Sequence, residues 1–183
     1  MSHAPLSISF EAVILAGGKS SRMGRDKALL RLGGRSLLSW IRTACRDADI
    51  PCRILRKDAV PDCGPLGGIL TALRSTRYAA CLFLSCDMPF VSTSLLQQLA
   101  RKAAQARCSV FTRSAHGVGF PAILWVRMLP RVEEAIQERS LSVQCLAVAV
   151  RATHLAPRNP SLELLNVNTP ADWKHARDVF RNR

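Results

Sequence analysis

The sequence alternates short apolar runs with helical patterns, and this alternation restricts the fold more than any other feature. Apolar runs at residues 11–15, 52–55 and 81–85 have the length of buried strands, and turn residues follow the first and the third. Strands that alternate with helices predict a mostly parallel sheet that is covered by helices on both faces. The expected fold class is therefore α/β, with three α/β/α layers.

The remaining segments predict the order of elements along a single domain that spans residues 1–183. Ser36 is a plausible N-cap for a first helix, and Ser92 or Thr93 for a helix that ends near Ala106. Pro170 suits the first turn of a C-terminal helix. Further expected elements are a turn at 63–68 with a helix beginning at 69, strands at 109–112, 120–125 and 162–167, a helix at 127–139 and a short helix within 142–150.

The charge of the chain points to anionic ligands. Lys and Arg number 26 against 13 Asp and Glu, which gives a net charge of +13. Such an excess suits a nucleotide, a phosphorylated cofactor or a nucleic acid. The basic residues are spread along the whole chain, aromatic residues make up only 5%, and no zinc-finger or aromatic RNA-binding pattern occurs. A specific nucleic-acid partner is therefore not expected.

The chain lacks the sequence features of secreted and membrane proteins. No apolar run approaches the roughly 18–20 residues that a membrane span needs, and residues 1–10 do not resemble a secretory signal. The seven cysteines include no CxxC pair, and Cys81, Cys108 and Cys145 fall in apolar runs. We therefore expect a cytoplasmic protein with no membrane contact, whose thiols are reduced and mostly buried.

The loop after the first strand has the composition of a phosphate-binding loop. Gly17 and Gly18 permit a close approach of the backbone to a ligand, and Arg22 and Lys27 supply cationic donors. The lysine lies too far from the glycines for a Walker A loop, and the segment is not GxGxxG either. The alternative is a basic surface turn, in which four cations within nine residues would repel one another.

A carboxylate follows the most apolar run. Asp87 comes two residues after the predicted strand at 81–85, in the sequence Ser-Cys-Asp-Met-Pro. A carboxylate at the end of a buried strand can hold Mg²⁺ against a phosphate. The alternative is an aspartate at a loop or a helix start.

The segment LAGGKSSRMGRDK, from Leu15 to Lys27, resembles the signature loop of the sugar-phosphate and cofactor nucleotidyltransferases, which have a Rossmann-like fold. Within that group it is most similar to the molybdenum cofactor guanylyltransferases. The resemblance implies transfer of GMP from GTP to molybdopterin, the substrates, with release of pyrophosphate. It also implies Mg²⁺ as cofactor and transient contact with other molybdenum cofactor proteins.

Three more motifs extend the resemblance along the chain. The family carries C-D-x-P where Asp87 stands, with the aspartate as metal ligand, so Arg22, Lys27 and Asp87 are the implied catalytic residues. Gly64-Pro-Leu-Gly resembles a segment that borders the base, and Asp58 matches an aspartate that contacts the nucleotide. The implied nucleotide-binding residues are Leu15, Ala16, Gly17, Gly18, Arg22, Lys27, Asp58, Gly64, Pro65, Leu66, Gly67 and Asp87.

The third motif lies near the C-terminus. Asn166 and Asn168, in NVNTPAD, match a family motif. On a strand their side chains would point the same way and could complete a metal or substrate shell. Alternatively the segment caps the last helix, and Thr169 before Pro170 has the pattern of a cap. Both interpretations stay open.

One region departs from the family pattern. Only residues 47–63 separate the first helix from the GPLGG segment, so one strand is expected to be missing or merged, together with its nucleotide-contacting Asn. The alternatives to a guanylyltransferase are a cytidylyltransferase for the same cofactor, a sugar-phosphate nucleotidyltransferase, and a binding protein that has lost turnover.

Overall fold

A six-stranded sheet forms the centre of the protein. The computed structural model describes residues 10–17 and 30–182. The strand order is β4-β1-β5-β7-β6-β8, and only the two pairs that involve β7 are antiparallel. The mostly parallel sheet expected from the sequence is confirmed. The strands are β1 (Phe10–Leu15), β4 (Cys52–Leu55), β5 (Ala80–Ser85), β6 (Val110–Ser114), β7 (Gly117–Trp125) and β8 (Thr153–Leu155).

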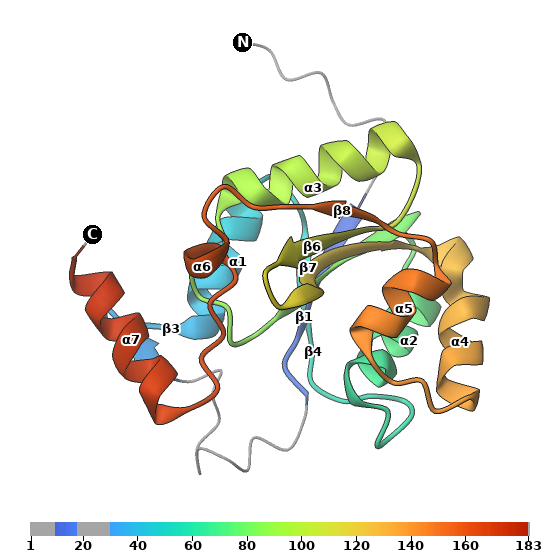
Figure 1. The fold of residues 1–183 in the computed structure, drawn as a ribbon, viewed down its shortest axis with the longest axis horizontal. Helices are drawn as coiled ribbons and strands as arrows, with labels where there is room; N and C mark the ends of the chain where they lie inside the picture. The colour runs from blue at the N-terminus through green and yellow to red at the C-terminus, as the bar shows by residue number, and fades with distance from the viewer. Residues whose placement is uncertain (1–9, 18–29, 183) are drawn as a thin grey trace.

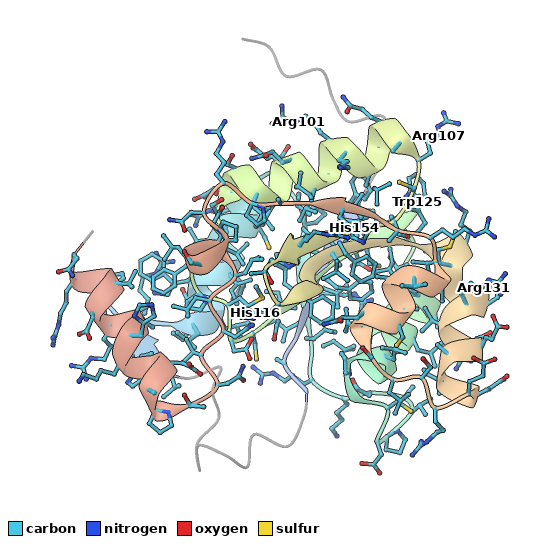
Figure 2. The ribbon with its side chains drawn as sticks, in the orientation of Figure 1. Arg101, Arg107, His116, Trp125, Arg131 and His154 are labelled. Atoms are coloured by element: carbon cyan, nitrogen blue, oxygen red, sulfur yellow. The ribbon has the colours of Figure 1, made fainter. Side chains whose placement is uncertain are left out.

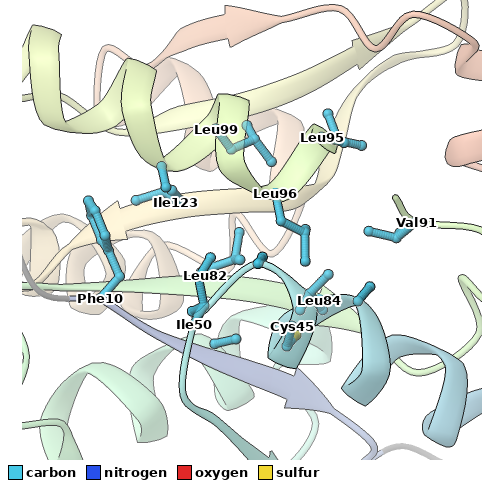
Figure 3. Packing of buried hydrophobic residues seen from close by; sticks show 14 of the residues in the cluster. Phe10, Cys45, Ile50, Leu82, Leu84, Val91, Leu95, Leu96, Leu99 and Ile123 are labelled. Atoms are coloured by element: carbon cyan, nitrogen blue, oxygen red, sulfur yellow. The ribbon is translucent and has the colours of Figure 1, made fainter. Parts of the chain in front are cut away.

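Helices cover both faces of the sheet (Figure 1). On one face α1 (Leu37–Asp47) and α3 (Thr93–Ala106) pack against the sheet through residues such as Ile14, Leu82 and Ile123, as Figure 3 shows for the last two. On the other face lie α2 (Gly64–Ser75), α4 (Leu129–Gln137) and α5 (Val143–Ala149), against Val13 and Phe83. Neighbouring strand residues thus serve opposite faces, and each fully buried aliphatic side chain contributes about 1.5–3 kcal/mol. The three-layer α/β/α fold is confirmed.

Helix caps follow the sequence closely. The Ser36 and Ser92 hydroxyls accept hydrogen bonds from Ser39 N and Leu95 N, each at 3.1 Å, and they begin α1 and α3. The predicted turn at 63–68 is wrong, because α2 already begins at Gly64. Proline in the first turn needs no N–H partner, so GPLGG opens the helix instead of preceding it. The predicted helix at 127–139 is a 3₁₀ turn, η2 (Val126–Met128), followed by α4.

The C-terminal region holds the largest error of the sequence-based prediction. Residues 162–167 form no strand; a one-turn helix, α6 (Pro160–Glu163), leads into a loop. The edge of the sheet is taken by β8, which was not predicted and which pairs in parallel with β6. The physical reason is that Leu162, Leu165 and Val167 pack in a separate apolar cluster, so the pattern that resembled a strand reflects that cluster.

This separate cluster joins the C-terminal helix to the segment that precedes α1. Helix α7 (Pro170–Arg181) packs beside a short hairpin of β2 (Arg31–Leu32) and β3 (Arg35–Ser36), and lies apart from the sheet in Figure 1. Thr169 caps α7 in a capping box with Asp172. The predicted cap at Thr169-Pro170 is thus confirmed.

The thiols are less buried than the sequence suggested. Cys45, Cys63 and Cys81 are buried and none of the seven cysteines forms a disulfide, but Cys145 is exposed because it lies on the outer face of the short helix α5. Within residues 10–17 and 30–182, no helix has the length and apolar character needed to cross a membrane.

Candidate functional site

The carboxyl ends of three neighbouring strands gather the predicted site residues. Strand β1 lies between β4 and β5. The connection from β1 to β4 through α1 and the connection from β4 to β5 through α2 therefore lie on opposite faces of the sheet. Backbone hydrogen bonds tie the loops together there: Ala16 N donates to Leu55 O at 2.8 Å, and Cys86 N donates to Leu15 O at 3.2 Å. Ligands of open α/β sheets bind at such a switch in strand order.

Asp87 lies just past the end of β5. Its Oδ1 is buried and has no hydrogen-bond partner in the part of the chain that the structure describes. Leaving a buried carboxylate oxygen unpaired is unfavourable, and a divalent cation would satisfy it. Within those same residues no cluster of three metal-ligating side chains occurs.

The NVNT segment is attached to the Asp87 loop by its backbone. Val167 N donates to Asp87 O at 2.9 Å, and the Val167 side chain is fully buried. Asn166 is exposed and Asn168 half-buried, and they lie on a loop, which corrects their predicted place on a strand. The structure thus brings Asn166, Asn168 and Asp87 to the same region, although through loop geometry and not through the sheet.

Gly17, just after β1, and Gly67, in the first turns of α2, form a glycine surface on which neighbouring backbone packs closely. An ideal Cβ on Gly17 would lie 3.1 Å from Arg56 O, and one on Gly67 would lie 2.7 Å from Val60 O. Any side chain at these positions would be crowded by backbone, which explains the glycines. The loop after β4 therefore packs directly on the loop after β1 and on the first turns of α2.

Asp58 projects its carboxyl onto this glycine surface. Ideal Cβ positions on Gly17, Gly67 and Gly68 would lie 3.5, 3.3 and 3.3 Å from its carboxyl oxygens. The residue as a whole is exposed, but burial of the carboxyl against the backbone raises its pKa above the ordinary value. The loop is held by Ala59 N, which donates to the Thr71 hydroxyl at 2.8 Å. Asp58 is thus fixed next to the glycines with which it was predicted to act.

The other predicted nucleotide-binding residues differ in how accessible they are to a ligand. Leu66 is fully buried in the core, so a ligand could reach only its backbone, whereas Gly64 and Pro65 are exposed. Leu15 and Ala16 are half-buried at the end of β1. The three predicted residues Gly18, Arg22 and Lys27 lie outside the described residues. The interval 47–63 holds one strand, β4, in parallel register with β1.

A cleft of about 850 Å³ opens on the other side of Asp87. Ser85 and Met88, which lie within two residues of Asp87 in sequence, line it together with Asn166 and Asn168. Its long wall is the hairpin of β6 and β7, from Ser114 to Phe120, and its opposite wall includes residues 160, 161, 164 and 165 at and after α6. The candidate site therefore has two parts, the glycine surface with Asp58 and this cleft, with Asp87 between them in the strand order.

The hairpin wall was not predicted from the sequence. His116 lines the cleft at the turn of the hairpin (Figure 2), and this turn points toward α6 in Figure 1. The available signal was the Gly-Val-Gly sequence of residues 117–119, since glycine at the start of a strand often marks a close approach of another group.

Comparison with known proteins agrees with the motifs. Residues 12–55 and 45–147 match the model of the MobA-like NTP transferase domain. The molybdenum cofactor guanylyltransferases of Xanthomonas euvesicatoria and Pseudomonas putida are 35% and 34% identical to the chain; the alignments cover 88% and 86% of the chain and 90% and 92% of those proteins. The solved structure of molybdopterin-guanine dinucleotide biosynthesis protein A from Archaeoglobus fulgidus is similar in fold, with a TM-score of 0.74, 20% identity and coverage of 94% of this chain and all of that one.

Proposed function

Because this chain belongs to the MobA-like NTP transferase family, we propose that it transfers GMP from GTP to molybdopterin and releases pyrophosphate. The product is the guanine dinucleotide form of the cofactor. One observation carries the proposal: Asp87 Oδ1 is buried, has no hydrogen-bond partner among the described residues, and follows the strand that lies between the glycine surface and the cleft. The names of the relatives support guanine as the base and molybdopterin as the acceptor.

The glycine surface is the proposed place of the nucleotide. Gly17 is exposed, so a base or a phosphate can approach its backbone from solvent, whereas the buried Gly67 lets the loop that carries Asp58 pack close by. Asp58, held against that surface, can accept hydrogen bonds from N–H or O–H groups of the nucleotide. Gly18, Arg22 and Lys27, which lie outside the described residues, remain the proposed phosphate ligands by their resemblance to the family motif.

The proposed reaction is an in-line displacement at the α-phosphorus of GTP. A phosphate oxygen of the acceptor forms the new P–O bond, and the bond to the bridging oxygen of the β-phosphate breaks, so pyrophosphate leaves with that oxygen. A phosphomonoester is largely ionised near neutral pH, so the attacking oxygen needs no strong general base. The protein then acts by positioning and by neutralising charge.

Asp87 is the proposed ligand of Mg²⁺. Its unpaired oxygen fits a divalent ion, and the bound ion would supply charge neutralisation at the α-phosphate. The hydrogen bond from Val167 N to Asp87 O would hold the loop that carries Asp87 in place while substrates bind and products leave.

The deciding experiment mixes the purified protein with Mg²⁺, molybdopterin and either GTP or CTP. We expect pyrophosphate release with GTP and, by mass spectrometry, a dinucleotide product. Preference for CTP would instead favour a cytidylyltransferase for the same cofactor. Turnover with sugar phosphates as acceptors would favour a sugar-phosphate nucleotidyltransferase. Binding of GTP with no product under any acceptor would contradict the proposal and favour a binding protein.

A further inference from the structure

The cleft beside Asp87 differs in charge from the rest of the molecule. The chain carries +13, but of the cleft-lining residues that the structure describes only His116 can become charged. A phosphate group needs cationic or multiple N–H donors when it leaves water. A site selected to hold phosphate within this cleft would be expected to use some of the abundant basic residues, and none of the described lining residues is Lys or Arg. The described lining therefore suits an uncharged group.

The lining also indicates what kind of uncharged group fits. Val118, Phe120 and Leu164 provide apolar surface. Ser114 and Asn166 provide neutral hydrogen-bonding groups from the two sides. Apolar walls with a few neutral polar groups are typical of sites for flat heterocycles that carry donors and acceptors at their edge.

Gly119 leaves a bare strip in the hairpin wall. An ideal Cβ at this position would meet nothing within 4 Å in the described residues, and its backbone lies outside the left-handed region that only glycine favours. Gly117, two residues earlier, is different, because its Cβ would lie 2.7 Å from Gln144 Nε2. The glycine at 117 is explained by its backbone, whose φ is +111°, whereas the space at Gly119 belongs to the cleft.

The strip is held in a fixed position. The Thr112 hydroxyl donates to Gly119 O at 3.1 Å, and Thr112 is buried. At the turn, Gln144 Nε2 on α5 donates to His116 O at 3.4 Å. A wall fixed at both points keeps its shape when a ligand enters, so the width of the cleft at Gly119 acts as a size limit.

We propose that the strip at Gly119 contacts the uncharged ring system of the acceptor, and that the missing side chain sets the size of the ring that the enzyme accepts. The acceptor's phosphate would then lie outside the cleft, toward Asp87. The inference rests on the proposed function for the identity of the acceptor, but its prediction of an uncharged ligand follows from the described lining residues.

The test compares Gly119→Leu with Ala106→Leu. The first fills the cleft, whereas the second adds a larger group than alanine at an exposed position near the end of α3, remote from the cleft lining. For Gly119→Leu we expect the KM for molybdopterin to rise at least tenfold with the KM for GTP within twofold of the wild-type value. Ala106→Leu should leave both unchanged. Equal acceptor KM values for wild type and a folded Gly119→Leu would overturn the inference.

A binding measurement separates this inference from the proposed function. An uncharged pterin without a phosphate is titrated into the wild type, and its fluorescence is followed. We expect saturable binding of the pterin that GTP does not displace and that Gly119→Leu abolishes. If the leucine variant fails to fold, Gly119→Ala is used in its place and should weaken pterin binding. Absence of pterin binding by the wild type, or displacement by GTP alone, would overturn the inference. Binding without any transfer from GTP would contradict only the proposed function.

Discussion

The backbone N–H of Val167 donates a 2.9 Å hydrogen bond to the carbonyl oxygen of Asp87. Val167 is fully buried, in the cluster that also contains Leu37 and Ala176. Packing of the C-terminal segment is thereby connected to the position of the carboxylate that we propose as metal ligand. This connection depends on one backbone N–H group, and it can be tested by removing that N–H.

Val167→Pro removes the N–H donor, whereas Val167→Ala keeps it. We expect the proline variant to lose at least tenfold in kcat for pyrophosphate release, because the Asp87 loop is no longer tied. The alanine variant should lose roughly 2 kcal/mol of unfolding free energy through the smaller side chain, with kcat unchanged while it is folded. Wild-type kcat in a folded proline variant would show that the hydrogen bond is not needed.

Asp87→Ala should separate activity from stability. The variant removes a buried oxygen that has no described partner, so in EDTA we expect it to be as stable as the wild type or about 1 kcal/mol more stable. Transfer should be abolished. In thermal unfolding Mg²⁺ with GTP should raise the Tm of the wild type and not that of the variant. An equal Mg²⁺-dependent shift in both proteins would place the metal elsewhere.

Asp58→Asn should change stability in a pH-dependent way. Burial raises the pKa of this carboxyl in the folded state, so the charged form is disfavoured on folding. The penalty is fully present above the folded-state pKa and vanishes below the unfolded-state value of 3.8. We therefore expect the variant to be more stable than the wild type in urea at pH 7, with the difference lost near pH 3.5. An advantage that persists at the lower pH would have another cause. If Asp58 contacts the nucleotide, the variant should also bind GTP more weakly.

Gly67→Ala tests the close packing of the loop after β4 on α2. The new Cβ would lie 2.7 Å from Val60 O, and overpacking of this kind typically costs about 1–3 kcal/mol. Higher helix propensity offsets about 1 kcal/mol of that cost. We expect a net loss of stability in urea and a higher KM for GTP, because Asp58 lies in the displaced loop. Gly119→Ala, which meets open space, is the control for stability alone and should be at least as stable in urea as the wild type.

The cysteines offer a test of the fold that does not depend on activity. Cys145 is exposed, whereas Cys45 and Cys81 are fully buried and burial raises the pKa of each to about 12. The thiolate is the reactive form, so a thiol reagent at pH 8 should modify Cys145 first and should reach Cys45 and Cys81 only on unfolding. Mass spectrometry of labelled peptides identifies the sites. Rapid labelling of Cys81 in the native protein would be incompatible with its place in β5.

Local sequence signals were sufficient for the elements that depend on near neighbours. The caps at Ser36, Ser92 and Thr169 were predicted because a helix start depends on a hydrogen bond between the cap side chain and the backbone amide three residues later. The buried strands β1 and β5 were predicted because both faces are covered and few polar residues interrupt them. These features also placed Gly17 and Asp87 at the ends of strands.

What the sequence determined by itself was therefore the alternation of strands and helices, the capped helix starts and the chemistry of the motif residues, since each depends on residues adjacent in the chain. Only the tertiary structure decided that β8 and not residues 162–167 takes the sheet edge, that Asp58 lies against Gly17 and Gly67, and that the β6–β7 hairpin forms an uncharged cleft. Those features arise from packing between segments far apart in sequence, where competition for the same apolar surface is settled by the free energy of the whole fold.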